Sequence, residues 1–130
     1  MRLANPLLLP PLTLAYLGDA LYEAFVRERL LELGYVRVND LHQHALRYVR
    51  ASAQAAILGH LMPALTEQEL DVVRRGRNAK GHGAPKSADP AEYAASTGFE
   101  ALLGYLHLAG EEARLRQLLQ AAANFVEQGH

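Results

Sequence analysis

The sequence contains no cysteine, and it has no apolar run long enough to cross a membrane. Because cysteine is absent, disulfide bonds and thiolate metal sites are excluded, and the composition gives no indication of secretion. A membrane-spanning helix needs ~20 consecutive apolar residues, and the N-terminus also lacks the layout of a signal peptide. We therefore expect a cytoplasmic protein with no membrane partner.

The sequence also lacks an excess of one charge and a convincing strand-like alternation of apolar and polar residues. Its 13 basic and 14 acidic residues give a net charge of −1, so the whole molecule is not a basic nucleic-acid binder. Half of the residues are apolar and recur at helical spacing, which predicts an all-α fold of about five to seven helices. We expect a single domain over residues 1–130, with a loose, proline-containing lead-in over residues 1–11.

Local signals mark where the predicted helices begin and end. Thr66-Glu67-Gln68-Glu69 is a capping box, and Asp89-Pro90 combines a capping aspartate with a proline in the first turn. Asn39 and Ser52 are the expected caps of two other helices, and Gly34 is expected to end the first helix. The predicted helices cover residues 12–33, 40–65 with a break near 50–52, 67–78, 90–108 and 111–128.

An acid stands in the middle of the first predicted helix, in Leu17-Gly18-Asp19-Ala20. Gly18 costs the helix about 1 kcal/mol relative to alanine. The neighbours of Asp19 one turn away are largely apolar, and a carboxylate on such a face must be paired, protonated or bound to a metal. Two exceptions to local rules, side by side, indicate a functional site.

A similar exception occurs far downstream, where Glu100 lies among small and apolar residues of another predicted helix. Gly98 and Gly104 remove side-chain bulk near the same face, which allows a second helix to approach closely. We predict that the two helices cross at their glycines and bring Asp19 and Glu100 together. The alternative is that each acid reaches solvent or pairs with an arginine.

Five of the 13 basic residues fall in a stretch without acids between Asp71 and Asp89, namely Arg74, Arg75, Arg77, Lys80 and Lys86. Compensation of a helix dipole explains two arginines but not five cations. The glycines of this stretch allow close contact with a phosphate chain, and its lack of aromatic residues argues against stacking on single-stranded bases. The pattern predicts recognition of a nucleic-acid duplex by its backbone and shape, the alternative being a solvated basic loop.

Three motifs together resemble the Mini-III ribonucleases, which are compact relatives of ribonuclease III that consist of the catalytic domain alone. They are Leu17-Gly18-Asp19-Ala20, Arg74-Arg75-Gly76-Arg77-Asn78-Ala79-Lys80 and Phe99-Glu100-Ala101-Leu102-Leu103-Gly104-Tyr105. The likeness extends over residues 14–119, in the same order and spacing. It implies a homodimeric, all-helical endoribonuclease that uses Mg²⁺, with Mn²⁺ as a substitute, to cut double-stranded RNA. We expect that no separate double-stranded RNA-binding domain follows, since the chain ends at His130.

The resemblance assigns roles to particular residues. It implies that Asp19 and Glu100 hold the catalytic metal, and that the substrate is precursor large-subunit ribosomal RNA, with a ribosomal protein assisting cleavage. We expect Tyr16 and the first helix to contribute to the dimer contact. The resemblance also implicates six residues in duplex binding: Arg77, Asn78, Lys80 and Lys86, together with Arg74 and Arg75.

The sequence departs from the pattern of full-length ribonuclease III at two acidic positions. That pattern has a glutamate four residues before the first aspartate and an aspartate three residues before the final glutamate, where this chain has Ala15 and Thr97. The departure leaves the number of metal ions open. Glu23, one turn after Asp19, is a candidate to replace part of the lost charge.

Two alternatives to an enzyme remain open at this point. The first is a non-catalytic duplex-RNA-binding or ribosome-assembly protein on the same fold, which lost activity with the missing acids. The retained Asp19 and Glu100 argue against it. The second is a helical interaction module without a nucleic-acid role, which predicts no duplex binding even at low salt.

Overall fold

The structure, a computed structural model, describes residues 5–79 and 87–129 and consists of helices and their connections. These residues form six α-helices and two 3₁₀-helices and contain no strand, which confirms the predicted all-α class. The elements are η1 Pro6–Leu8, α1 Pro11–Glu32, α2 Val38–Val49, α3 Ala51–Leu61, η2 Met62–Ala64, α4 Glu67–Arg77, α5 Pro90–Leu108 and α6 Glu112–Glu127.

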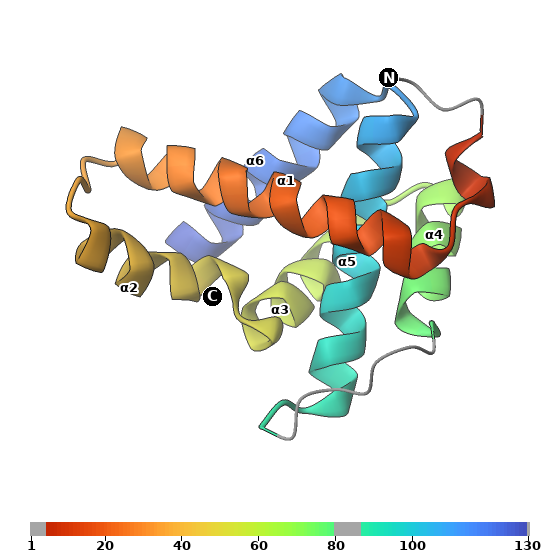
Figure 1. Cartoon of the computed structure of the whole chain (residues 1–130), viewed down its shortest axis with the longest axis horizontal. Helices are drawn as coiled ribbons and strands as arrows, with labels where there is room; N and C mark the ends of the chain where they lie inside the picture. The colour runs from red at the N-terminus through yellow and green to blue at the C-terminus, as the bar shows by residue number, and fades with distance from the viewer. Residues whose placement is uncertain (1–4, 80–86, 130) are drawn as a thin grey trace.

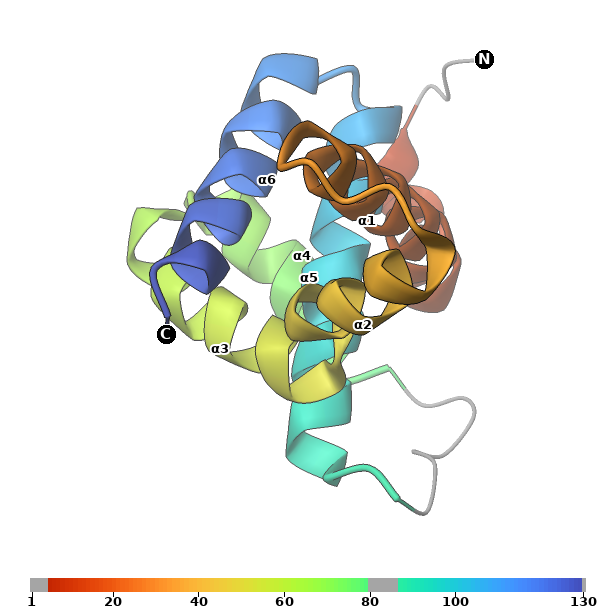
Figure 2. The same ribbon diagram turned by 90° about the vertical axis from the view of Figure 1, so that its left-hand side faces the viewer.

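The helices pack around α5, which runs through the middle of the molecule (Figure 1). Helix α5 contacts α1, α3, α4 and α6, and its most extensive contact is with α1, which crosses it at a steep angle. In the view turned by 90°, the other helices surround the later part of α5, whose first turns extend beyond them (Figure 2). Residues at the α1–α5 crossing therefore lie where two segments far apart in the sequence meet.

Several helix ends match the local signals of the sequence. Thr66 and Glu69 form both hydrogen bonds of the capping box, and Asp89 caps α5 through the backbone N–H groups of the first turn. Gly34 and Gly110 follow helix ends with φ angles of 103° and 78°, a conformation that favours glycine.

Two of the predicted caps are wrong. Asn39 lies inside α2, whose N-cap is Arg37, and Ser52 lies inside α3, whose N-cap is Arg50. The carbonyl of Arg37 accepts the first helical hydrogen bond of α2 from the N–H of Leu41, and the carbonyl of Arg50 accepts that of α3 from the N–H of Gln54. Neither arginine caps through its side chain, so backbone bonding alone moved each helix start upstream of the polar residue.

The lead-in, expected to be loose, is packed on the body over residues 5–10. The side chain of Asn5 accepts a hydrogen bond from the N–H of Leu7, and Pro6 is buried in the resulting 3₁₀ turn. Leu7 and Leu9 pack on a small buried cluster that includes Leu14 of α1. This contact holds the start of α1, and so helps to place its middle over α5.

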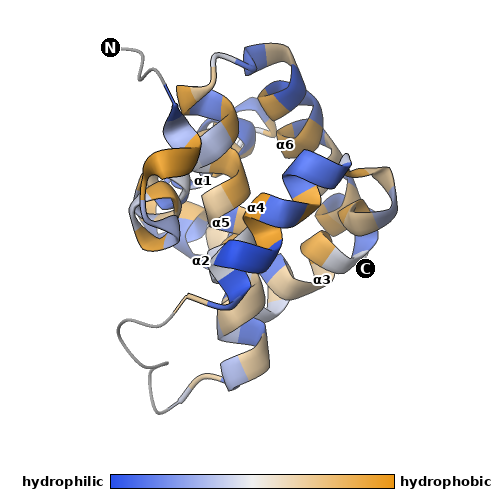
Figure 3. Ribbon diagram, turned by 90° about the vertical axis from the view of Figure 1, so that its right-hand side faces the viewer, coloured by the Kyte–Doolittle hydropathy of each residue, from blue (hydrophilic) through white to orange (hydrophobic). Residues whose placement is uncertain are grey.

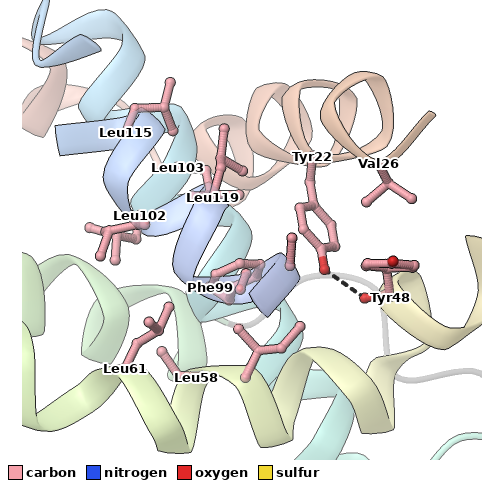
Figure 4. Packing of buried hydrophobic residues seen from close by; sticks show 14 of the residues in the cluster. Tyr22, Val26, Tyr48, Leu58, Leu61, Phe99, Leu102, Leu103, Leu115 and Leu119 are labelled. Carbon is pink, nitrogen blue, oxygen red and sulfur yellow. Dashed lines mark hydrogen bonds between the residues drawn. The ribbon is translucent and has the colours of Figure 1, made fainter. Parts of the chain in front are cut away.

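The main core lies between α1, α5 and the surrounding helices (Figure 4). Tyr22 packs edge-on against Phe99 with ring centroids 5.2 Å apart, and its hydroxyl donates to the backbone carbonyl of Tyr48 over 2.8 Å. Helix α4, in contrast, consists mostly of hydrophilic residues (Figure 3). Within the described part of the chain, every helix is too short or too polar to cross a membrane.

Candidate active site

Helices α1 and α5 touch backbone to backbone at two glycines. A Cβ atom on Gly18 would lie 1.7 Å from the carbonyl oxygen of Glu100, and one on Gly104 would lie 2.0 Å from the carbonyl oxygen of Leu14. Neither position can hold a larger residue without displacing a helix. The prediction that these helices cross at their glycines is confirmed, and Asp19 and Glu100 are brought together as a result.

Gly98 serves a different crossing from the one predicted for it. A Cβ atom there would lie 2.8 Å from the carbonyl oxygen of Val73 and 2.8 Å from Cγ of Arg77, both on α4. Gly76 of α4 faces it, since its own Cβ would lie 2.8 Å from the Cα of Gly98. This second glycine pair packs the basic end of α4 directly on α5, the helix that contains Glu100.

Asp19 and Glu100 meet across the α1–α5 crossing, close enough for Asp19 to act on Glu100 through hydrogen bonding and charge. Two carboxyl groups this close repel each other when both are ionised. Burial, followed by the bond to Asp19 and its charge, raises the pKa of Glu100 to about 8, and the charge of Glu23 acts in the same direction. A hydrogen bond from Gln54 opposes the rise in pKa. Without a cation, the site therefore does not keep both carboxyl groups ionised at neutral pH.

The side chain of Asp19 is exposed, and Glu100 is the more enclosed of the two acids. The sequence placed Asp19 on an apolar face of its own helix. In the structure that part of α1 borders an open pocket, which gives Asp19 access to solvent.

A pocket of about 520 Å³ opens beside the two acids. Ala15 and Thr97, which replace the two missing acids of the ribonuclease III pattern, both line it. Glu23 is not among the lining residues, and it forms an ion pair of 3.7 Å with Arg27. The pocket is lined by Leu12, Ala15, Tyr16, Asp19, Val49, Ala51, Gln54, Tyr93, Ser96, Thr97 and Glu100.

Gln54 is a site residue that the sequence analysis missed. It is 3% exposed, and its Nε2 donates to Oε2 of Glu100 over 3.2 Å and to the carbonyl oxygen of Val49 over 2.9 Å. One signal was available, because Gln54 is a polar residue surrounded by the apolar run of the α3 sequence. That signal did not indicate which residue it would meet.

Of the residues assigned to duplex binding, those that the structure describes lie at the end of α4. Arg74 pairs with Asp71, and Arg75 is partly buried, with a guanidinium N–H donating to the carbonyl oxygen of Leu9 over 3.5 Å. Arg77 and Asn78 are exposed. Two further residues assigned to duplex binding, Lys80 and Lys86, lie outside the described residues.

Tyr16, the residue expected at a dimer contact, is 84% exposed on α1 and also lines the pocket. Leu12, one turn earlier, is 38% exposed and lines it too. The two side chains form an apolar rim next to the acids. A large aromatic residue that is exposed in this way is available to a partner.

Comparison with known proteins identifies the class to which this helical arrangement belongs. Residues 12–111 match the ribonuclease III domain family, a range that contains both acids and the end of α4. The structure also resembles the crystal structure of a protein from Fusobacterium nucleatum, with a TM-score of 0.78 and 29% sequence identity over 92% of each chain.

Individual relatives narrow the class. A protein of Symbiobacterium thermophilum named Mini-ribonuclease 3 is 86% identical over 129 residues, which is 99% of both chains. A Mini-ribonuclease 3 of Desulfitobacterium hafniense is 55% identical over 88% of this chain and 73% of its own length. The chain thus belongs to the Mini-ribonuclease 3 proteins of the ribonuclease III domain family, and it is an endoribonuclease.

Proposed function

We propose that this chain cleaves double-stranded RNA with a divalent cation held between Asp19 and Glu100. The observation behind the proposal is the contact of the two carboxyl groups at the glycine crossing, beside an open pocket. Packing alone gives no reason to place one acid against another. A divalent cation held by Asp19 and Glu100 would give both carboxyl groups a partner of opposite charge.

The donor set fits Mg²⁺, with Mn²⁺ as a substitute. Mg²⁺ prefers oxygen ligands, keeps several of its waters and is commonly held by one or two carboxylates together with substrate phosphate. The site offers two carboxyl groups and, in addition, Oε1 of Gln54, a buried oxygen without a hydrogen-bond partner in the described part of the chain. With Ala15 and Thr97 in the pocket, the protein itself supplies few ligands, which leaves room for water and phosphate.

The residues of the site have separate tasks in the proposed reaction. When bound, the cation would promote attack of water on the scissile phosphate and stabilise the charge that develops there. Asp19, the exposed acid, and Glu100, the more enclosed one, would hold the cation and so set its position relative to the RNA backbone. Products with a 5′-phosphate and a 3′-hydroxyl are expected.

The basic end of α4 is proposed to bind the duplex. The Gly76–Gly98 crossing packs this end on α5, so its exposed side chains have a fixed relation to Glu100. Binding through phosphates predicts an affinity that falls steeply with salt. The proposed contacts are Arg74, Arg75, Arg77 and Asn78, joined by Lys80 and Lys86 outside the described residues.

We propose that the active form is a homodimer in which Tyr16 contributes to the contact. The exposed apolar rim of Tyr16 and Leu12 supports this proposal, and a dimer would present two sites to one duplex. Sedimentation tests it, since Tyr16→Ala is expected to weaken dimer formation. An unchanged association constant in this variant would remove Tyr16 from the interface.

The proposed natural substrate is precursor large-subunit ribosomal RNA, with a ribosomal protein as an assisting partner. The family membership supports this assignment. Cleavage of a precursor transcript can be compared with cleavage of an unrelated duplex of equal length, with and without added ribosomal proteins. Equal rates on both RNAs under both conditions would contradict the assignment.

The main test compares the wild type with Asp19→Asn on a labelled RNA duplex in Mg²⁺. Cleavage is expected to disappear in the variant while duplex binding persists, because one of the two carboxylates is lost. Asp40→Asn is a matched control, since Asp40 is an exposed acid on α2 that does not line the pocket. Equal cleavage by all three proteins would contradict the proposed metal site. Binding without cleavage in the wild type would favour a non-catalytic RNA-binding protein.

A further inference from the structure

Gln54 is held in one orientation by two hydrogen bonds. Its Nε2 has two N–H groups, one donating to the carbonyl oxygen of Val49 over 2.9 Å and the other to Oε2 of Glu100 over 3.2 Å. Turning the amide over would place Oε1 against two acceptors, so the observed orientation is set by the surroundings. The amide therefore restricts the position of one oxygen of Glu100.

The remaining polar atom of Gln54 has no such partner. Oε1 is buried, and no donor in residues 5–79 or 87–129 bonds to it. Buried polar side-chain atoms in native proteins are nearly always paired, so an unpaired acceptor in a side chain that is 3% exposed calls for a ligand. Gln54 lines the same pocket as Asp19 and Glu100, which is where such a ligand would enter.

The fold builds this arrangement at the junction of α2 and α3. Arg50 leaves the helical conformation, with φ −57° and ψ 148°, and ends α2. The carbonyl of Val49 is thereby left without a partner in its own helix, and it accepts from Gln54 instead. Gln54 lies one turn into α3, directed by this bond toward Glu100 on α5.

We propose that Gln54 is a positioning residue of the metal site, which orients Glu100 through Nε2 and offers Oε1 as a hydrogen-bond acceptor to the hydrated cation. This inference rests on the proposed function, since it requires a cation at Asp19 and Glu100. A neutral amide can orient a ligand without adding a third negative charge where Ala15 and Thr97 have replaced acids. The site can then fold before the cation arrives.

The competing interpretation is that Gln54 only joins α2 to α3. Both interpretations predict that removing the amide lowers the melting temperature, so stability alone does not separate them. They differ for cation affinity. Groups that orient metal ligands typically contribute 10–100-fold to affinity, whereas a joint between helices contributes nothing to it directly.

The first experiment measures Mn²⁺ and Mg²⁺ binding by titration calorimetry without RNA, in the wild type, Gln54→Met and Gln54→Leu. We expect cation affinity to fall about 10–100-fold in both variants, while duplex affinity in EDTA stays the same. Ile57→Val is the matched control, because Ile57 is fully buried on α3 but does not line the pocket. It is expected to melt earlier and to bind cations like the wild type. Wild-type affinity in both Gln54 variants would overturn the proposal.

A second measurement uses the wild type and so does not depend on a folded variant. In a ¹⁵N-labelled sample, the side-chain amide signals of Gln54 are expected to shift during a Mg²⁺ titration with the same midpoint as the backbone signals of Asp19 and Glu100. Unmoved Gln54 signals beside shifting Asp19 and Glu100 signals would overturn the proposal.

Asp19→Asn separates this inference from the proposed function. If it binds cations like the wild type, the metal site itself is wrong and the role of Gln54 falls with it. If Asp19→Asn loses the cation while Gln54→Met and Gln54→Leu retain it at full affinity, the inference about Gln54 alone is wrong.

Discussion

Two glutamates, Glu69 and Glu100, are withdrawn from solvent in this small protein, and their surroundings are opposite in charge. Glu69, at 4% exposure, accepts two hydrogen bonds of 2.8 Å from the guanidinium of Arg114 and one of 2.9 Å from the N–H of Thr66. These bonds, those of Arg114 first, hold the pKa of Glu69 below its usual value. Glu100 meets another acid, and burial with Asp19 raises its pKa.

The difference separates an acid used for folding from one used for binding. All the partners of Glu69 belong to the protein itself. Its positive charge comes from Arg114 of α6, and its N–H donor is Thr66 of the capping box. Glu100 has no partner of opposite charge among the described residues around it, which include Asp19 and the unpaired Oε1 of Gln54. A cation would supply the missing positive charge. Strongly perturbed acids occur at functional sites as well as in ion pairs, so the sign of the partner charge decides between the two interpretations.

The largest expected effect comes from neutralising each glutamate in turn. Glu100→Gln is expected to reduce cleavage on the order of 10³-fold, because it removes several kcal/mol of cation binding at the transition state. At pH 8 in EDTA the variant should also be more stable than the wild type by roughly 1 kcal/mol, and so melt at a higher temperature. The reason is that an enclosed carboxyl group beside another acid is removed. Cleavage assays and thermal melts measure the two effects.

Glu69→Gln is the matched variant and should behave in the opposite way. It leaves Arg114 without its charge partner, and we expect a loss of about 3 kcal/mol in stability with little change in cleavage per folded molecule. A Glu100→Gln protein that melts lower than the wild type and still cleaves would remove the distinction between the two glutamates.

The sequence was sufficient to predict the pair at the α1–α5 crossing. Gly18 and Gly104 break helix propensity within helices that are otherwise regular, and close approach of two backbones is the physical reason for such glycines. The sequence did not indicate which acid would be enclosed. A position on a helix is defined relative to that helix, whereas exposure depends on the neighbour, and α1 borders the pocket at Asp19.

Contacts between distant polar residues were not predictable in the same way. The capping box predicted that Glu69 would bond to Thr66, which is three residues away, but Arg114 is 45 residues away and no local pattern connects the two. The hydrogen bond between Gln54 and Glu100, which are separated by 46 residues, was missed for the same reason. Helix signals are local, whereas the pairing of buried polar groups is decided by packing.

The second prediction breaks the crossing itself. Gly18→Ala places a Cβ atom 1.7 Å from a backbone oxygen that cannot move away without its helix. We expect a loss of about 3 kcal/mol or more in stability, together with loss of cation binding, since Asp19 and Glu100 separate. Chemical denaturation and calorimetry measure the two effects.

Gly59→Ala is the matched control, because Gly59 lies in α3 with no atom within 4 Å of its would-be Cβ. It is expected to gain roughly 0.5–1 kcal/mol from better helix propensity. Equal behaviour of the two variants would mean that the crossing at Gly18 is not tight.

The third prediction removes the partner of Glu69 and depends on pH. Arg114→Ala loses the paired bonds to Glu69 and the bond of 2.8 Å to the carbonyl oxygen of Ala64, and we expect a cost of about 3 kcal/mol at pH 7. Folding lowers the pKa of Glu69 from its unfolded value near 4.5, so the ionised carboxylate stabilises the folded protein above that pH. This stability is lost as the pH falls through the pKa of Glu69 in the folded protein. The stability gap between wild type and Arg114→Ala should therefore narrow below pH ~4.5. A gap of constant size from pH 7 to pH 3 would show that the charge of Glu69 contributes little.

The smallest expected effect comes from adding an acid beside Glu100. Thr97 lines the pocket, and Thr97→Asp restores a carboxylate of the full-length ribonuclease III pattern. Without a cation the added charge should lower the melting temperature, because a third acid joins two that already lie close together. With Mn²⁺ the order should reverse, and we expect roughly tenfold tighter binding, equivalent to about 1.4 kcal/mol. Thr97→Asn has nearly the same shape without the charge and is expected to show neither effect. If Thr97→Asp lowers stability equally with and without Mn²⁺, the pocket is a cluster of acids and not a cation site, and Glu100 loses its contrast with Glu69.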